Sequence, residues 1–182
     1  MPSVPGLKRV LIDADELATR VREVGRQLAQ DYAEREPILV GVLTGAVVFL
    51  SDLMRVMDVP LQCDFIGLSS YGEASRSSGI VKITADLTVP IEGRHVLIVE
   101  DIIDTGRTIS YLRRNLETRR PESLRICTLL DKIERREVPV ELDYVGFTIP
   151  KEFVVGYGLD YAGLYRNLPY LAALDLGDRP AG

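Results

Sequence analysis

The apolar residues follow two spacings, the short continuous or alternating runs of strands and the i, i+3, i+4 pattern of helices. Strand-like runs lie at 10–12, 38–43, 61–65, 80–84, 96–99, 125–130 and 144–148. Helical spacing lies between them, on faces made of Leu17, Val21, Val24, Leu28 and Tyr32, of Phe49, Leu53 and Met57, and of Ile109, Leu112 and Leu116. Strands that alternate with helices predict an α/β fold, with a mainly parallel central sheet covered by helices on both faces.

Ligands in such folds gather at the carboxyl ends of the parallel strands. Two segments with candidate chemistry, 43–45 and 100–108, lie at the ends of the predicted strands 38–43 and 96–99, so we expect them at one crevice. Residues 69–79, Ser-Ser-Tyr-Gly-Glu-Ala-Ser-Arg-Ser-Ser-Gly, are polar and have no period. A gap of this length inside a compact domain is typical of a mobile functional loop.

The segment Val-Leu-Ile-Val-Glu-Asp-Ile-Ile-Asp-Thr-Gly-Arg-Thr, residues 96–108, carries the most informative chemistry. A buried run is followed by Glu100 and Asp101, then by Asp104 and a glycine turn at a helix start. Loop amides and hydroxyls at a helix N-terminus hold phosphate, and carboxylates hold sugar hydroxyls or a hydrated Mg²⁺. The spacing is that of neither a Walker A loop nor a dinucleotide fingerprint. The alternative, an acidic helix cap, needs one carboxylate where this segment has three.

Composition and length narrow the class of protein and its compartment. A length of 182 residues suits one domain, 1–182, and we expect a frayed tail at 175–182. A net charge of −5 argues against a nucleic-acid surface, and no apolar run reaches the roughly 18 residues of a membrane span. The first residues lack a secretory core, and Cys63 and Cys127 are expected to be buried free thiols, so the cytoplasm is favoured. His95, the single histidine, is expected to be structural or on the surface, which argues against a zinc site or a histidine-based triad.

The wording Val-Glu-Asp-Ile-Ile-Asp-Thr-Gly resembles the ribose-phosphate motif of the phosphoribosyltransferases, in the form of their hypoxanthine-guanine branch. Further segments match that family in order, from about Leu39 to Arg166. The resemblance implies a type I phosphoribosyltransferase fold, with a small base-binding hood made by the terminal segments. It also implies purine salvage with Mg²⁺: transfer of the phosphoribosyl group of 5-phosphoribosyl 1-diphosphate to N9 of hypoxanthine or guanine, giving IMP or GMP and diphosphate.

Within this motif the resemblance implies that Glu100 and Asp101 bind the ribose hydroxyls and Mg²⁺. Asp104 becomes the acid/base that accepts the N7 proton of the purine and stabilises developing positive charge. The ribose-phosphate site as a whole consists of Glu100, Asp101, Ile102, Ile103, Asp104, Thr105, Gly106, Arg107 and Thr108. Many relatives carry lysine at the position of Arg107. We expect arginine to be tolerated there, since backbone amides supply many of the contacts to the 5′-phosphate.

The leaving diphosphate is expected at Leu43, Thr44 and Gly45, which resemble the family's diphosphate loop, and at Arg166, whose guanidinium suits that anion. Many relatives carry lysine where this chain has Thr44. The family often has a non-proline cis peptide in this loop, and the sequence leaves open whether the Leu43–Thr44 peptide is cis. An ordinary strand-to-helix turn is the alternative for 43–45.

The base-binding site is expected to consist of four residues of the second half of the chain, Lys132, Phe153, Val154 and Asp160. Lys132 matches the lysine that donates to the 6-oxo group, and such a site rejects adenine because the donor would be left unpaired. Phe153 matches the aromatic that stacks on the base, and Val154 offers backbone groups to its Watson–Crick edge. Asp160 would coordinate a second Mg²⁺ or its waters. The alternatives are a solvated lysine in the charged segment 132–143 and ordinary core packing at 153–155.

Ser70 and Tyr71 resemble the pair that closes over the active site of the family, within the expected mobile loop. Such a lid suits the reaction, because water would intercept an oxocarbenium-like state at the sugar. A flexible surface loop is the alternative.

Rival functions stay open. One is a xanthine-preferring enzyme, and another serves uracil with a regulatory RNA-binding role, although the Glu-Asp-Ile-Ile-Asp wording speaks against uracil. A third is a non-catalytic sensor of 5-phosphoribosyl 1-diphosphate, which would tend to lose Asp104 or Tyr71. Family members form homodimers or homotetramers, and their partners are the two small substrates rather than nucleic acid or membrane.

Overall fold

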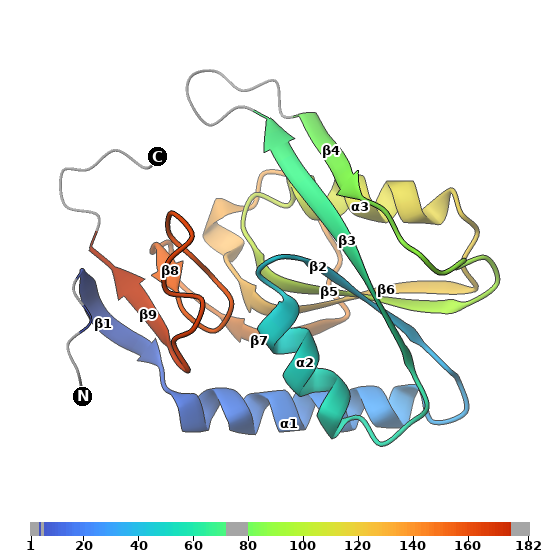
Figure 1. Ribbon diagram of the computed structural model, residues 1–182, viewed down its shortest axis with the longest axis horizontal. Helices are drawn as coiled ribbons and strands as arrows, with labels where there is room; N and C mark the ends of the chain where they lie inside the picture. The colour runs from blue at the N-terminus through green and yellow to red at the C-terminus, as the bar shows by residue number, and fades with distance from the viewer. Residues whose placement is uncertain (1–3, 5, 72–79, 176–182) are drawn as a thin grey trace.

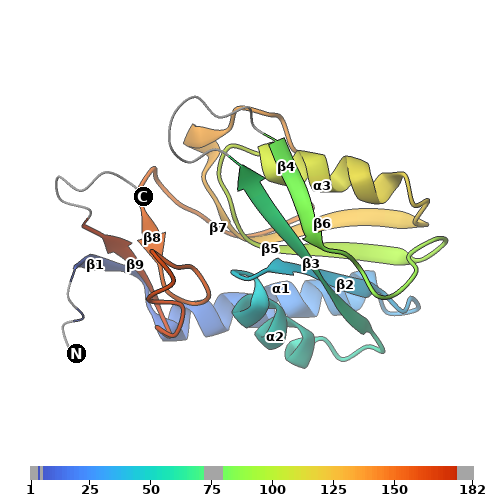
Figure 2. The same cartoon turned by 45° about the horizontal axis from the view of Figure 1, so that its top comes forward.

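The computed structural model describes residues 4, 6–71 and 80–175, which form two sheets (Figures 1 and 2). The large sheet has six strands in the order β4-β3-β2-β5-β6-β7. Its strands are β2 (Ile38–Leu43), β3 (Gln62–Tyr71), β4 (Ile80–Ala85), β5 (His95–Ile103), β6 (Ser123–Asp131) and β7 (Tyr144–Thr148). Every pairing is parallel except that of β3 with β4, so the predicted mainly parallel sheet is confirmed.

Helices cover both faces of this sheet, as predicted. Helices α1 (Ala14–Asp31) and α2 (Val47–Val56) lie on one face and α3 (Arg107–Glu117) on the other (Figure 1). Alternate residues of a strand point to opposite faces, and two cores follow from this. Leu39 and Leu97 pack with α1 and α2, whereas Val40 and Ile98 pack with α3. The predicted apolar faces of all three helices are buried.

Two strands are longer than their apolar runs indicate. The strand β5 continues through Glu100 and Asp101 to Ile103, because its backbone stays paired with β6 up to Asp131. The strand β3 ends at Tyr71, so residues 69–71 of the expected loop are strand, and 72–79 lie outside the described residues, as do 176–182 of the expected tail.

The prediction for Cys63 is wrong and that for Cys127 is confirmed: Cys63 is exposed and Cys127 is buried. Cys63 lies in the first half of β3, where β4 provides no pairing, since β4 pairs only with Gly67 to Tyr71. His95 starts β5 and its Nδ1 lies 2.8 Å from Ser123 Oγ on β6, which fits the expected structural role.

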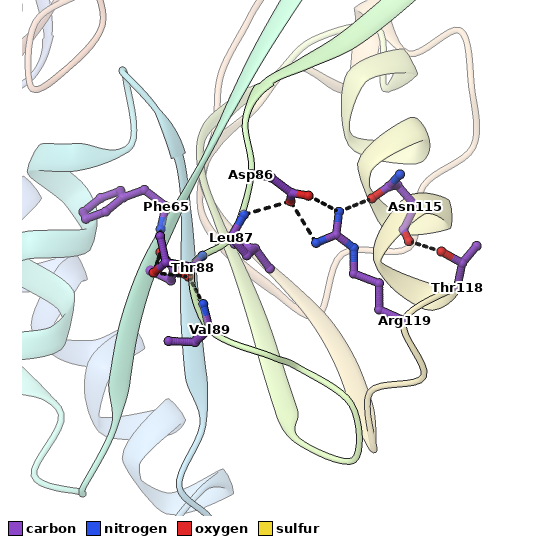
Figure 3. A network of polar contacts seen from close by, with 9 residues as sticks. Phe65, Asp86, Leu87, Thr88, Val89, Asn115, Thr118 and Arg119 are labelled. Carbon is purple, nitrogen blue, oxygen red and sulfur yellow. Dashed lines mark hydrogen bonds and ion pairs between the residues drawn. The ribbon is translucent and has the colours of Figure 1, made fainter.

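The connection from β4 to β5 is fastened at two points (Figure 3). Asp64 on β3 accepts hydrogen bonds from the backbone N–H groups of Thr88 (2.7 Å) and Val89 (3.0 Å). Burial opposes ionisation, but backbone hydrogen bonds outweigh it and hold the pKa of Asp64 below its ordinary value. Asp86 pairs with Arg119, just beyond α3, at 2.8 Å. Together these contacts join β3, the connection that follows β4 and the segment that follows α3.

The small sheet has the order β1-β9-β8 and lies beside the large one (Figure 2). Its strands are β1 (Leu7–Ile12), β8 (Val154–Val155) and β9 (Leu171–Leu174), all antiparallel to their neighbours. Segments from both ends of the chain therefore build it, as expected of the hood. The helix α1 follows β1 directly, and Asp13 caps it by accepting a hydrogen bond from Glu16 N–H (2.9 Å). Among the helices in the described part of the chain, none is both long and apolar enough to cross a bilayer.

Candidate active site

A cavity of about 160 Å³ lies where β5 passes into α3. Its lining contains eight of the nine predicted ribose-phosphate residues, all except Arg107, together with Ile109. It opens at the carboxyl end of β5, the edge of the sheet at which the crevice was expected. The structure therefore gathers the predicted ribose-phosphate residues around one hollow.

Glu100 and Asp101 are half-buried carboxylates on β5. Burial raises the pKa of Glu100 well above its ordinary value, and the charge of Asp101 adds to the rise. Burial also raises the pKa of Asp101, although a hydrogen bond from Ile102 N–H (2.8 Å) and the charge of Arg166 oppose the rise. Oε2 of Glu100 is closed off from solvent and has no hydrogen-bond partner. Two adjacent carboxylates with an unpaired buried oxygen are suited to a cation or to hydroxyl donors.

The phosphate loop turns at Gly106, which has a φ of 84° and starts α3. A Cβ at this position would lie 2.6 Å from Val138 O, so both the left-handed backbone and the close approach require glycine. Arg107 lies just outside the cavity lining and forms an ion pair with Glu137 (2.6 Å). The segment after β6 therefore packs directly on this loop.

The predicted diphosphate loop lies between β5 and the segment after β8. Its Leu43–Thr44 peptide is cis, which answers the question that the sequence left open. A Cβ on Gly45 would lie 1.7 Å from Asp101 Oδ2, and a Cβ on Gly158 would lie 2.1 Å from Gly45 O. Gly45 is thus in contact with the acidic pair on one side and with the 156–160 segment on the other.

Arg166 and Asp160 form an ion pair of 2.6 Å beside this loop. Arg166 Nη1 also donates to Gly158 O (2.6 Å), and Gly163 N–H donates to the second oxygen of Asp160 (2.8 Å). Both carboxylate oxygens of Asp160 are therefore engaged. Within residues 4, 6–71 and 80–175, no group of three or more His, Cys, Asp or Glu side chains is arranged to hold a metal, so Asp160 does not join Glu100 and Asp101 in one cluster.

Lys132 follows β6 and is only 7% exposed, which contradicts the solvated alternative for this residue. Its backbone N–H donates to Ile103 O (3.0 Å), so it lies next to the phosphate loop. Burial lowers the pKa of Lys132, and the negative charge of Asp104 partly opposes this. Asp104 itself lies 2.8 Å from Arg135 Nε. The structure thus places the expected acid/base and the expected base-reading lysine within electrostatic range of each other.

Phe153 and Val154 lie at the junction of the two sheets. The Phe153 side chain is partly exposed, and its ring packs edge-on against Tyr161, with centroids 5.5 Å apart and planes at 87°. Val154 is buried and pairs with Ala173 on β9. Core packing therefore describes Val154 and Val155, whereas Phe153 retains accessible ring surface for a flat ligand.

Ser70 and Tyr71 are the last residues of β3, where their backbone pairs with Val81 and Ile80 of β4. Because β3 is parallel to β2 and β5, its carboxyl end lies on the same edge of the sheet as the cavity. This backbone position suits residues that approach the site from the neighbouring strand.

Several contacts of the site have no counterpart in the sequence analysis. Tyr157 Oη donates to Asp52 Oδ2 on α2 (2.6 Å), which fixes the segment that carries Gly158. Arg136 pairs with the buried Asp131, and Arg135 pairs with Asp104. These partners come from separate elements, so periodicity has no access to them. The adjacent Arg135 and Arg136, shortly after β6, were the signal available for the two arginine contacts.

Comparisons with known proteins agree with this geometry. The phosphoribosyl transferase domain model matches residues 11–162. A hypoxanthine-guanine phosphoribosyltransferase of Streptococcus pneumoniae is 50% identical over 92% of this chain and 93% of its own length. A crystal structure of a hypoxanthine phosphoribosyltransferase from Staphylococcus aureus has a TM-score of 0.90 and 46% identity, and covers 94% of this chain and 93% of that one.

Some relatives are much longer than the chain. The bifunctional protein TilS/HprT of Listeria innocua is 54% identical over 92% of this chain, which spans only 26% of that relative's length. The domain match nevertheless covers the strands β2 to β8, the glycine turn and the acidic pair described above. This chain belongs to the phosphoribosyltransferase family, in its hypoxanthine-guanine branch.

Proposed function

We propose that this protein is a purine salvage enzyme that transfers the phosphoribosyl group of 5-phosphoribosyl 1-diphosphate to N9 of hypoxanthine or guanine. The observation that carries the proposal is the convergence of three carboxylates on one cavity at a glycine turn, with buried Lys132 beside it. An acidic pair suits the ribose hydroxyls, the loop amides suit the 5′-phosphate, and the lysine suits a 6-oxo group. Relatives with these names share about half of the sequence.

In the proposed reaction the bond from the sugar anomeric carbon to the diphosphate oxygen breaks, and the bond to N9 of the purine forms. The N7 proton of the purine is shared with or passes to Asp104, whose carboxylate lies in the cavity lining. Lys132 donates to the 6-oxo group and so selects a 6-oxopurine. Arg166 and the 43–45 backbone hold the diphosphate as it leaves. Ser70 and Tyr71 exclude water from the reacting carbon.

Mg²⁺ is the proposed cofactor, and the residues present fit it. Mg²⁺ is usually held by one or two carboxylates together with substrate oxygens and waters, which matches the acidic pair of Glu100 and Asp101. The unpaired, solvent-excluded Oε2 of Glu100 supports a ligand at this position. When bound, the ion neutralises the diphosphate and makes it a better leaving group. Asp160 can contribute to a second ion only if it exchanges its present contacts with Arg166 and Gly163.

The choice between hypoxanthine, guanine and xanthine depends on C2 of the base, where backbone groups near Val154 are the proposed readers. A xanthine-preferring enzyme is therefore the alternative. Assembly into a homodimer or homotetramer, location in the cytoplasm, the single-domain organisation and the roles of individual site residues stay predictions.

A diphosphate-release assay tests the proposal. The protein is supplied with Mg²⁺ and 5-phosphoribosyl 1-diphosphate, and separately with hypoxanthine, guanine, xanthine, adenine or uracil. We expect release with hypoxanthine or guanine, which is abolished by chelation of the metal. Saturable binding of the phosphoribosyl donor without turnover of any base would contradict the proposed enzyme and indicate a non-catalytic sensor.

A further inference from the structure

A second basic residue faces the proposed acid/base, besides the lysine that was expected there. Arg135 Nε lies 2.8 Å from Asp104 Oδ1, in a pair whose side chains are 43% and 38% exposed. Oδ1 is closed off from solvent and makes no aligned hydrogen bond. The guanidinium therefore lies against Oδ1 by charge attraction, and Oδ2 is the oxygen that can accept from a substrate N–H.

The backbone delivers Arg135 to this position. Arg135 belongs to a short 3₁₀ turn, η1 (Ile133–Arg135), whose first bond runs from Arg135 N–H to Lys132 O (3.1 Å). Before the turn, Lys132 N–H donates to Ile103 O (3.0 Å). After it, the N–H groups of Glu137 and Val138 both donate to Thr105 O (2.9 and 3.0 Å).

Asp104 lies between Ile103 and Thr105 in the sequence, and the carbonyls of these two residues accept the bonds from the connection after β6. The connection after β6 is thus tied to the phosphate loop on either side of Asp104, and Arg135 lies between the two ties. Such an arrangement fixes the backbone of Arg135 relative to the backbone of Asp104, which keeps the guanidinium within reach of the carboxylate. The same ties fix Lys132 relative to Asp104.

We propose that Arg135 is a positioning residue for Asp104: it holds Oδ1, so that Oδ2 faces N7 of the purine. The inference rests on the function proposed above, because it assigns the orientation of that function's acid/base. An aspartate on a loop has several accessible orientations, and catalysis depends strongly on keeping the productive one. Ion pairs with this exposure contribute little to stability. The pair is therefore expected to affect turnover much more than folding.

The test compares Arg135→Met, which keeps an unbranched side chain and removes the guanidinium and its charge, with Arg135→Lys. We expect Arg135→Met to lower kcat about 10- to 100-fold, with KM for 5-phosphoribosyl 1-diphosphate changed less than about twofold and Tm nearly unchanged. Arg135→Lys should recover part of kcat. The matched control is Arg113→Met, which removes an arginine of similar exposure that pairs with Glu117 on the outside of α3. The control should retain the kcat of the unmodified protein.

A double mutant separates positioning from other roles. In an Asp104→Asn background, Arg135→Met should cause no further loss of kcat, since its effect passes through Asp104. An unchanged kcat in the single variant, or an equal loss in both backgrounds, overturns the inference while the proposed function stands. A lack of turnover by the unmodified protein with every base overturns the proposed function, and the inference with it.

Discussion

Gly45 and Asp101 are in such close contact that a Cβ at position 45 would lie 1.7 Å from Asp101 Oδ2. Gly45→Ala should therefore displace the carboxylate of Asp101 or the 43–45 backbone. Displacements of about 1 Å in an active site cost about 100-fold in rate, so we expect a loss of kcat/KM of this order. Steady-state kinetics with varied 5-phosphoribosyl 1-diphosphate measures it.

Gly41→Ala on β2 is the matched control. A Cβ there would lie 2.7 Å from Leu50 Cδ2 and close to the Phe65 ring, which are side-chain atoms of the core. Overpacking of this kind costs about 1–3 kcal/mol of stability without touching the acidic pair. A Gly45→Ala variant that loses stability but keeps full kcat/KM would contradict the catalytic importance of this contact.

Replacement of Asp104 by asparagine removes the proposed proton acceptor while keeping its size. We expect kcat to fall about 10²- to 10⁴-fold, the usual contribution of a general acid/base. Binding of 5-phosphoribosyl 1-diphosphate, measured by calorimetry, should stay within a few-fold, because the acidic pair and the loop amides are unchanged. Full activity of Asp104→Asn would remove this residue from the mechanism.

Lys132→Met removes the buried ammonium and keeps an unbranched side chain. The kcat/KM for hypoxanthine should fall at least about 100-fold, whereas the low activity with adenine should change little, because only the 6-oxo group accepts from the lysine. Lys8→Met, at an exposed position on β1, is the control. Unchanged discrimination between the two bases would show that another group reads position 6.

Glu100→Gln should stabilise the protein while it weakens metal and substrate binding. Burial raises the pKa of Glu100 above its ordinary value of 4.5, so the folded state holds this proton more tightly than the unfolded state does. The favourable contribution is complete below the ordinary pKa and is lost as the pH rises through the raised value. The gain from glutamine should therefore increase between about pH 5 and about pH 8.

Glutamine removes the uncompensated buried charge, and we expect a gain of about 1–3 kcal/mol, which corresponds to a rise in Tm of roughly 2–10 °C for the variant at the higher pH. Thermal unfolding at both pH values, with and without Mg²⁺, measures this difference. Mg²⁺ should raise the Tm of the unmodified protein more than that of the variant. A variant with lower Tm at high pH would contradict the assignment of Glu100 as an uncompensated charge.

Tyr157→Phe should loosen the segment that holds Gly158 against the diphosphate loop. It removes the hydrogen bond to Asp52 and should cost about 1–3 kcal/mol, and KM for 5-phosphoribosyl 1-diphosphate should rise several-fold. Tyr144→Phe removes a comparable hydroxyl, which donates to Asp31 (2.6 Å) and accepts from Arg125 (2.7 Å) away from the site. A similar loss of stability without a change in KM is expected for this control.

The central strands of the large sheet could be predicted because they are buried as nearly continuous apolar runs, and the helices because one residue in three or four is buried in a repeating way. β2 and β7 begin and end at the residues that their apolar runs indicate. The run before Glu100 indicates the end of a strand, yet β5 continues to Ile103. Backbone pairing with β6 decides this, since Glu100 pairs with Thr128 and Ile103 with Asp131. A side-chain pattern does not record that pairing.

The site could be predicted where one continuous segment supplies it, as at 100–108. The contacts that orient it could not. Arg135 reaches Asp104 because the connection between β6 and β7 folds back over the phosphate loop, and 132–143 has only the charged composition of a solvated segment. The same holds for Gly45, whose need for glycine comes from a carboxylate on another strand.

The pairing of β9 also affects the order in which the parts of the protein can fold during synthesis. On one edge, Ala172 and Ala173 of β9 pair with Val155 and Val154 of β8, and on the other edge β9 pairs with β1. The first described strand therefore cannot join its sheet until the last described strand has been synthesised. A nascent chain that has completed the large sheet still lacks the wall against which the purine is proposed to bind. Since domains fold as they emerge during translation, this protein should acquire its phosphate-binding half before it becomes able to select a base.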